Sequence, residues 1–308
     1  MPARTPADIV DIGQCCWDIL LDVDRYPEVD AKRELLSRTE QGGGPVATAL
    51  VTLARLGVPC RFHGIVGDDD AADKIRGSLL AEGIDISGIT ARQGGYSQQA
   101  YIVVERETGR RTIFWQRPGG AELRLEELGV DFLEGARGLL LDGLMAEVSL
   151  SAARKAKSQG VTVMLDAGRL RPGMLETIRH CDYLVAAEQF AIDMGWSLEP
   201  EAFGEAAERT GAPVVTVTRG DRGSITWRRE EGVFQTPAFP VAAIDTTGAG
   251  DVFHGGYLYG VLQGWPLSDT IRFASACAAI KCTKSSGRAG IPNLQEVMSF
   301  LQSHDETI

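Results

Sequence analysis

Seven consecutive residues, Asp245-Thr-Thr-Gly-Ala-Gly-Asp251, carry the strongest chemical signal in the chain. An apolar, β-type stretch at 239–244 precedes them and a helical run follows. Gly248, Ala249 and Gly250 are therefore expected where an extended segment turns into a helix. The first backbone N–H groups of a helix have no partner within it, and small residues let an anion approach them. With Asp251 in the first turn, the segment predicts an anion cradle beside a candidate general base.

Length and composition limit the class of protein. The chain has 308 residues, 44% hydrophobic and 24% charged, as is usual for globular proteins. Its net charge of −11 argues against a nucleic-acid or anionic-membrane surface, and no apolar run reaches the length of about eighteen residues that a membrane helix needs. The stretch 1–8 lacks the apolar core of a signal peptide, and the six cysteines contain no C-x-x-C pair. We therefore expect a cytoplasmic protein.

Segments of strand length and segments of helical length alternate along most of the chain. Buried strands are expected at 7–13, 59–66, 138–142, 161–166, 183–185 and 214–218, with a hairpin at 225–235. Helices are expected at 46–56, 68–82, 250–262 and 267–283, with Asp68 as the N-cap of the second. This order predicts an α/β fold in three layers, a mainly parallel sheet with helices on both faces.

The segment 245–251 closely resembles the C-terminal signature of the ribokinase-like (PfkB) family of sugar and nucleoside kinases. A second stretch, Gly42-Gly43-Gly44 followed by a helix ending at 54–57, resembles the family's N-terminal signature. The resemblance implies an ATP-dependent carbohydrate kinase in which Asp251 deprotonates the acceptor hydroxyl. The amides of Gly248 to Asp251 would hold the charge of the transferring phosphoryl group. The resemblance covers essentially the whole chain.

The resemblance gives a role to extra strand-like segments near the N-terminus. In the family such strands form a small β lid over the sugar, and here they would come from about 18–40 and 88–116, with a hairpin around Thr108-Gly109. One kinase domain would span residues 1–308. Because lid strands leave an unpaired edge and an apolar face, we expect a homodimer formed through these two regions.

The candidate substrate-binding residues are Asp18, Gly43, Gly44 and Lys32. Asp18 follows the first strand where family members place an aspartate that accepts hydrogen bonds from sugar hydroxyls. The family's asparagine after the second glycine is replaced by Ala47.

The acceptor itself stays open. The run Gly-Arg-Ala-Gly-Ile-Pro at 287–292 resembles the sulfofructose-kinase branch, in which a lysine near the position of Lys32 contacts a sulfonate. Gln116 and Leu144 stand where that branch has an asparagine and an arginine.

ATP and Mg²⁺ are the implied cofactors. Thr218-Arg219-Gly220 resembles the family's nucleotide-phosphate turn, in which small residues, a hydroxyl and a guanidinium can contact phosphate oxygens. The family's Asn-x-x-Glu motif, which organises Mg²⁺ through water, falls on Ala187-Glu188-Gln189-Phe190. Glu188 is therefore the candidate carboxylate.

A monovalent cation is a further implied cofactor. In family members the tail after the last helix often encloses one, together with the aspartate and the second threonine of the signature. The candidate ligands here are Asp245, Thr247, Cys282 and Gly287, and the candidate ion is K⁺.

Other functions compete with that of a sugar kinase. A nucleoside kinase on the same fold is the nearest alternative. A non-catalytic sugar-binding protein stays open because of the departures at Ala187 and Phe190, although Asp251 argues against it. A dinucleotide-dependent oxidoreductase is disfavoured because no G-x-G-x-x-G follows the first strand, and a Walker P-loop is excluded because the chain contains no Gly-Lys pair.

Overall fold

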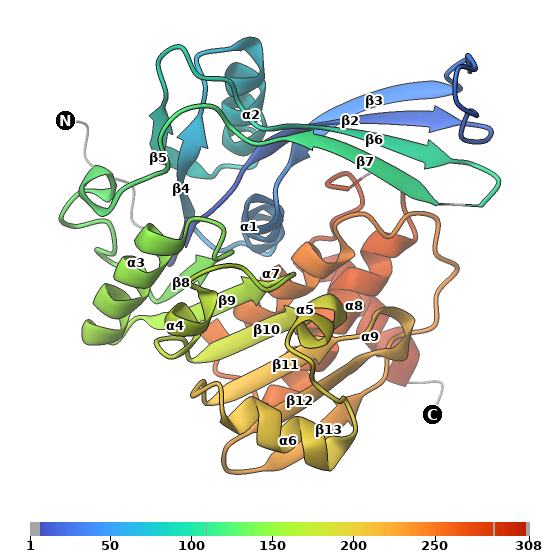
Figure 1. The fold of residues 1–308 in the computed structure, drawn as a ribbon. Helices are drawn as coiled ribbons and strands as arrows, with labels where there is room; N and C mark the ends of the chain where they lie inside the picture. The colour runs from blue at the N-terminus through green and yellow to red at the C-terminus, as the bar shows by residue number, and fades with distance from the viewer. Residues whose placement is uncertain (1–6, 109, 286, 306–308) are drawn as a thin grey trace.

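Two β-sheets form the framework of the structure, a computed structural model that describes residues 7–108, 110–285 and 287–305. The strands of the larger sheet are β1 Ile9–Ile12, β4 Cys60–Val66, β5 Asp85–Ala91, β8 Gly138–Leu141, β9 Thr162–Ala167, β10 Tyr183–Ala187, β11 Val214–Thr218, β12 Ser224–Arg228 and β13 Gly232–Thr236. They lie in the order β13-β12-β11-β10-β9-β8-β1-β4-β5. Pairing is parallel from β11 to β5, and the hairpin β12–β13 adds two antiparallel strands at one edge. The predicted mainly parallel α/β sheet is thus confirmed (Figure 1).

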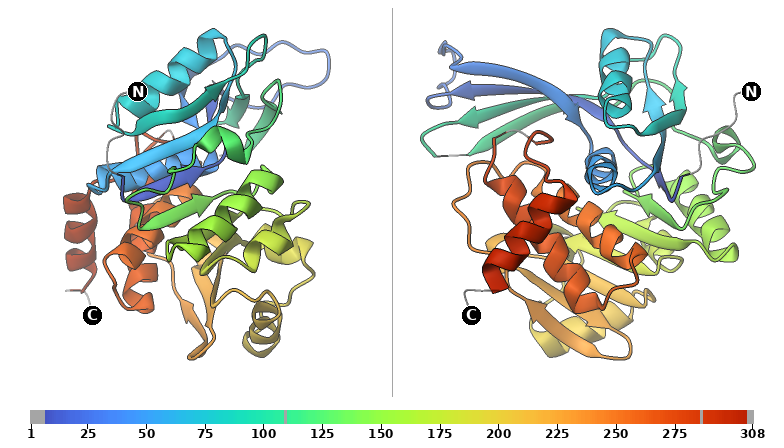
Figure 2. Two further views of the ribbon diagram at one scale, coloured as in Figure 1. Left: turned by 90° about the vertical axis from the view of Figure 1, so that its left-hand side faces the viewer. Right: turned by 180° about the vertical axis from the view of Figure 1, so that it is seen from behind.

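Successive side chains of the central strands divide the core into two layers. Ile9, Leu140 and Met164 belong to one apolar cluster, whereas their neighbours Val10 and Leu139 belong to the other. The first cluster is completed by α1 Pro45–Arg55, α2 Asp70–Leu80, α7 Ala249–Leu262, α8 Leu267–Cys282 and α9 Leu294–Asp305. The second is completed by α3 Ala146–Ser158, α4 Met174–Ile178, α5 Glu188–Asp193 and α6 Pro200–Glu208. Because strand side chains alternate in direction, the sheet is covered by helices on both faces (Figure 2).

Helix α7 is the central helix of the first layer. Gly255 faces α1, where a Cβ would lie 2.6 Å from the carbonyl oxygen of Ala49, and Gly256 faces α8, where a Cβ would lie 3.0 Å from Ala274 Cα. A glycine inside a helix costs about 1 kcal/mol relative to alanine, and close packing of two neighbouring helices offsets that cost. The first turn of α7 contains Asp251, so this packing fixes the position of the candidate base.

The smaller sheet is the lid. Its strands are β2 Cys16–Val23, β3 Ser37–Gly43, β6 Gln99–Glu105 and β7 Arg111–Gln116, in the order β3-β2-β6-β7. They extend away from the main body (Figure 1). The lid prediction for 88–116 is wrong for residues 88–91, which belong to β5 and pair with β4 in the larger sheet. Ile86 and Ile89 of β5 pack against the main core, and this burial is what holds the segment there.

Two local predictions differ from the structure. The N-cap of α2 is Asp69, whose Oδ1 accepts the N–H of Ala72 at 2.9 Å, whereas Asp68 accepts the N–H of Gly94. The apolar stretch 239–244 forms no strand in the described part of the chain. Pro237 and Pro240 lack the N–H that a sheet ladder needs.

Some expectations concern residues that are not described. Gly109 of the predicted hairpin and the first six residues lie outside the described ranges. Within those ranges, no helix has both the length and the apolar character required to cross a membrane.

Candidate active site

The signature segment forms the turn that leads into α7. Gly248 has a φ of +76° and is the N-cap, a conformation that is costly for residues with a Cβ. The N–H of Ala249 bonds to the carbonyl of Thr246, whereas those of Gly250 and Asp251 have no backbone partner in the described part of the chain. A Cβ on Gly248 would lie 3.7 Å from Asp251 Oδ2, so the carboxylate lies beside the turn. Unpaired amides and a carboxylate therefore meet at one helix end.

The half-buried Asp251 side chain lies among other carboxylates. Burial raises its pKa well above the usual value, and the charges of Asp166 and Asp18 raise it further, while Arg288 and Arg111 oppose the shift. A carboxylate with a raised pKa is a stronger base than an ordinary aspartate once it is ionised. This environment suits proton abstraction from a hydroxyl.

Asp18, Gly43 and Gly44 lie together where β2 and β3 meet the start of α1. Asp18 Oδ2 lies so close to Gly43 that a Cβ there would approach it to 2.1 Å, and Oδ1 accepts a hydrogen bond from Cys16 Sγ at 2.9 Å. Gly44 has a φ of +99°, and a Cβ there would meet the carbonyl of Gln14 at 2.4 Å. Gly43 therefore lets the Asp18 carboxylate approach the backbone just before α1, whereas Gly44 lets the backbone of Gln14 pack against it.

Arg288 was not identified from the sequence. Its guanidinium is buried and donates to three neutral oxygens: Gly43 O at 2.9 Å, Ser78 Oγ at 3.3 Å and Thr48 Oγ1 at 3.4 Å. Its positive charge opposes the raised pKa of both Asp18 and Asp251. The position of Arg288 inside the glycine-rich run 287–292 was the available signal, but its burial depends on packing that the sequence does not reveal.

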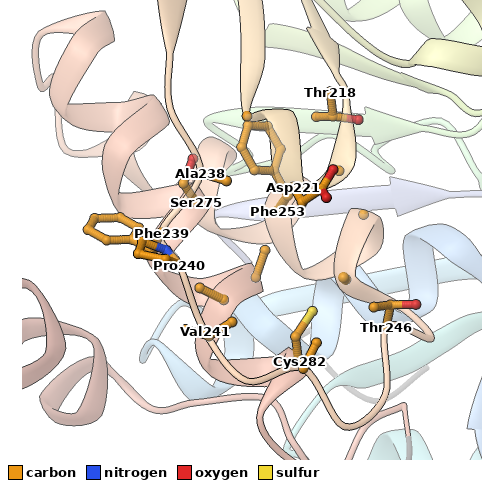
Figure 3. A pocket seen from close by; sticks show the side chains of 17 residues that line it. Thr218, Asp221, Ala238, Phe239, Pro240, Val241, Thr246, Phe253, Ser275 and Cys282 are labelled. Atoms are coloured by element: carbon orange, nitrogen blue, oxygen red, sulfur yellow. The ribbon is translucent and has the colours of Figure 1, made fainter. Parts of the chain in front are cut away.

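A cavity of about 430 Å³ opens beside the signature turn (Figure 3). Its walls are apolar and come from the loop that contains Phe239 and Val241, from Ala278 and Ala279 on α8, and from Phe253 on α7. One end is formed by Thr218 and Gly220, and the turn contributes Thr246, Ala249 and Gly250. An apolar slot that ends at unpaired amides suits a nucleotide, since the base binds apolar walls and the phosphates bind helix N-terminal amides.

The predicted cofactor residues are only partly brought together. Thr218 and Gly220 line the cavity, but the Arg219 guanidinium donates to Gln235 Oε1 at 3.0 Å and is not part of its lining. Glu188 pairs with Arg222 at 2.5 Å. Phe190, which stands at the glutamate position of the family motif, is fully buried and packs on Trp196, so Glu188 is the one carboxylate in this segment.

Asp245, one of the candidate cation ligands, contacts a lysine that was not identified from the sequence. Lys281 Nζ donates to the carbonyl oxygen of Asp245 at 2.7 Å and lies 3.7 Å from Asp245 Oδ2. The carbonyl of Cys282 accepts the N–H groups of Ile244 and Asp245, and Gly287 abuts Gln41. Among the described residues, no group of three or more His, Cys, Asp or Glu side chains is placed to hold a metal ion.

Two lid cations have different positions. Arg111 Nη1 donates to Thr247 Oγ1 at 3.0 Å, which places a guanidinium over the signature turn. Lys32 is exposed in the 24–36 connection, beyond the Asp22–Ser37 pair that ends the β2–β3 ladder. That pair lies four residues along β2 from Asp18, a distance of about 13 Å. Lys32 therefore belongs to the connection beyond the far end of this ladder, and its contact with a substrate stays a prediction.

Asp142, just after β8, is a further buried carboxylate near this edge of the sheet. Its two oxygens accept the N–H groups of Gln14 at 2.7 Å and Leu144 at 3.0 Å. Burial raises its pKa to about 7, in spite of these hydrogen bonds.

Comparison with known proteins agrees with this geometry. The model of the pfkB family of carbohydrate kinases matches residues 6–294. An ATP-dependent ribose-1-phosphate kinase from Halopiger xanaduensis is 29% identical over 95% of this chain and 97% of its own. A 5-dehydro-2-deoxygluconokinase from Geobacillus thermodenitrificans is 28% identical over 97% and 94%.

Solved structures give the same assignment. Ribokinase from Thermotoga maritima superimposes with a TM-score of 0.85 at 28% identity, covering 96% of this chain and 99% of that one. The family match spans almost the whole chain, and the geometry places the Asp251 carboxylate, the unpaired amides of the turn and the apolar cavity side by side. The protein therefore belongs to the pfkB family of carbohydrate kinases and is a phosphotransferase that uses ATP.

Proposed function

We propose that the enzyme phosphorylates a hydroxyl of an anionic sugar, either a sugar acid or a sugar phosphate. The observation that carries this proposal is the hydrogen bond from Arg111 to Thr247, which holds a lid cation over the signature turn. The net charge of the chain is −11, so an anionic acceptor needs local positive charge of this kind. The names of two relatives, a ribose-1-phosphate kinase and a 5-dehydro-2-deoxygluconokinase, support the same acceptor class.

In this proposal Asp251 accepts the proton of the acceptor hydroxyl as its oxygen attacks the terminal phosphorus of ATP. The bond from that phosphorus to the bridging oxygen breaks, and ADP leaves. The unpaired amides of Gly250 and Asp251, with the dipole of α7 behind them, hold the charge on the transferring group. Asp18 accepts hydrogen bonds from other sugar hydroxyls and so fixes the direction of the reacting one.

ATP would lie in the cavity between the 238–243 loop and α8, with its phosphates toward Gly250. Mg²⁺ accompanies ATP in this chemistry and neutralises the charge of its phosphates. Glu188 is the carboxylate that would orient water on the metal, and its partner Arg222 belongs to the segment beside the Gly220 end of the cavity. Because Phe190 stands where the family motif has its glutamate, Mg²⁺ would depend mainly on phosphate oxygens and water for its ligands.

The proposal extends to the domain organisation, the oligomeric state and the location of the protein. We infer one kinase domain over residues 1–308, a homodimer formed through the lid, and a cytoplasmic location. All six cysteines lie in the described part of the chain and are free, which fits a reducing compartment. A sulfonated ketose, the acceptor of the sulfofructose-kinase branch, is one member of the proposed anionic class. Contact of such a substrate with Lys32 requires either closure of the lid or a lid from a second subunit.

The test is a turnover screen with ATP across sugar acids, sugar phosphates, a sulfonated ketose, neutral sugars and nucleosides. We expect the best anionic acceptor to exceed neutral sugars by about tenfold or more in kcat/KM, the factor that corresponds to one charge-assisted contact. Arg111→Gln should remove most of this preference. Arg110→Gln, a neighbouring exposed arginine on the same hairpin, is the matched control and should keep it.

Three outcomes would contradict the proposal. Preference for a neutral sugar would show that the acceptor is not anionic. Preference for a nucleoside would identify the enzyme as a nucleoside kinase. Tight binding of a sugar without any turnover would identify a sugar-binding protein.

A further inference from the structure

Lys281 is a buried cation at the foot of the signature turn. Its side chain on α8 is 0% exposed, and its ammonium contacts both the carbonyl and the carboxylate of Asp245. Burial lowers the pKa of Lys281, and the charge of Asp245 opposes that shift. A lysine is almost never fully buried unless its charge is paired, so the contact with Asp245 is what permits this position.

Several of the oxygens expected to hold a monovalent cation already have partners. Of the expected ligands, Asp245 offers its carbonyl and Oδ2 to Lys281, and its Oδ1 accepts the N–H of Thr247 at 2.8 Å. The carbonyl of Cys282 accepts two N–H groups, at 2.8 and 3.2 Å. A K⁺ ion would need several of these oxygens and would lie next to the ammonium, where two positive charges repel. The residues present therefore do not fit a K⁺ ion.

We propose that the Lys281 ammonium replaces the monovalent cation of this site, so that the enzyme works without K⁺. The ammonium brings the same single positive charge to the same carboxylate, but the charge is covalently attached to α8. It ties the end of α8 to residue 245, the first residue of the turn that ends in the Gly250 amides. Lys281 is thus a positioning residue, which acts on the phosphoryl group through the turn. The activity readout rests on the proposed kinase reaction, whereas the stability readout does not.

The experiment compares K⁺ with tetramethylammonium at a constant ionic strength of about 0.1 M, where exposed charges are screened equally. We measure turnover and the midpoint of thermal unfolding for the parent, Lys281→Ala and Lys281→Met. The parent should have the same turnover and the same unfolding midpoint in K⁺ as in tetramethylammonium. Without K⁺, the turnover of Lys281→Ala should fall by about 10- to 100-fold, the range expected when reacting groups are misplaced. Addition of K⁺ or ethylammonium should restore much of this turnover.

The variants separate charge from packing. Lys281→Ala opens a space lined by oxygens, so K⁺ should raise its unfolding midpoint in a concentration-dependent way. Lys281→Met fills that space with an uncharged stem, so K⁺ should rescue neither readout. Lys284→Ala, which removes an exposed lysine three residues away, should behave like the parent.

Two results would overturn the proposal. One is a parent enzyme that K⁺ activates several-fold or stabilises specifically, a result that needs no variant to fold. The other is Lys281→Ala with parental turnover and no response to K⁺. If no acceptor is turned over, the proposed function fails, but the unfolding midpoints still decide the role of Lys281.

Discussion

Arg111 on the lid donates a hydrogen bond to Thr247 in the signature turn, across 3.0 Å and between residues 136 positions apart. The contact joins the edge strand of the lid to the residue just before the anion cradle. An exposed guanidinium is therefore held next to the turn that would bind the transferring phosphoryl group. Its charge also reaches Asp251, since it lowers the pKa that burial has raised.

Removing this charge should change the pH dependence of the reaction. Arg111 favours the ionised form of Asp251, so Arg111→Gln should raise the pKa of the base and move the acid limb of kcat/KM to higher pH. Because Arg111 is exposed, the shift should stay below about one pH unit. Profiles of the parent, Arg111→Gln and Arg110→Gln provide the measurement. An acid limb that is the same in all three would show that Arg111 does not act on the base.

Asp251 is expected to be the general base. A positioned base contributes about 10²–10⁴ in rate, so Asp251→Asn should lower kcat by that factor. The amide has the same shape, and the fold and ATP affinity should therefore survive. Asp269→Asn is the control because Asp269 stands in the first turn of α8 as Asp251 does in that of α7. Turnover of Asp251→Asn within a few-fold of the parent would remove the assignment.

The buried Asp142 should make stability depend on pH. Its folded pKa is about 7, whereas an unfolded aspartate has a pKa of about 3.9. Between these values the folded state holds one more proton than the unfolded state. The contribution of Asp142 to the free energy of unfolding therefore falls as pH rises, by at most about 1.4 kcal/mol per pH unit.

Asp142→Asn tests this linkage because asparagine does not titrate. Urea denaturation at several pH values between about 4 and 7 measures the free energy of unfolding. That free energy should fall with rising pH in the parent, and the fall should be smaller in the variant. The amide oxygen can keep one of the two backbone hydrogen bonds, so some overall loss of stability is expected at every pH. Parallel pH dependences of parent and variant would contradict the assignment.

The conformation of the signature turn could be predicted from sequence because its determinants are local. A left-handed Gly248, a helix that starts at Ala249 and an acid in the first turn are consequences of seven adjacent residues. The parallel sheet could be predicted for a similar reason, since short buried strands alternate with amphipathic helices along the chain.

Lys281, Arg111 and Arg288 could not be found in this way. Lys281 is one lysine in a helix of 16 residues, and only the packing of α8 against the signature turn buries it. Arg111 acts through a contact between segments far apart in sequence, and the role of Arg288 depends on the positions of Gly43 and Ser78. The contact of Lys32 with an anionic substrate stays a prediction, because Lys32 is exposed in the 24–36 connection, beyond the pair that ends the β2–β3 ladder.

The lid should mediate dimerisation. Ile19, Tyr101 and Phe114 pair across three neighbouring strands and so lie on one face, and Phe114 and Tyr101 are exposed. A second lid could cover this apolar row. Sedimentation should therefore find a dimer, and Phe114→Glu should shift it toward monomer. Val130→Glu changes another exposed apolar residue and should leave the dimer intact. A parent that stays monomeric at all concentrations would exclude this interface.

Gly255 and Gly77 provide a matched pair that tests how α7 is positioned. Both lie inside helices, but a Cβ on Gly255 would meet Ala49 O and Thr52 Cβ at 2.6 Å, whereas no heavy atom of the described residues lies within 4 Å of a Cβ on Gly77. Backbone atoms of α1 cannot shift without disturbing that helix. Gly255→Ala should therefore lower the free energy of unfolding by about 1–3 kcal/mol, the usual penalty for overpacking.

Gly77→Ala should change the free energy of unfolding in the opposite direction. It lies in the exposed interior of α2, so replacing glycine by alanine should stabilise the protein by about 0.5–1 kcal/mol. Gly255→Ala should also lower kcat more than Gly77→Ala does, because moving α7 away from α1 moves Asp251 with it. Chemical denaturation and kcat of both variants test these expectations. Equal stability of the two variants would show that α1 yields to the added methyl group and does not fix the first turn of α7.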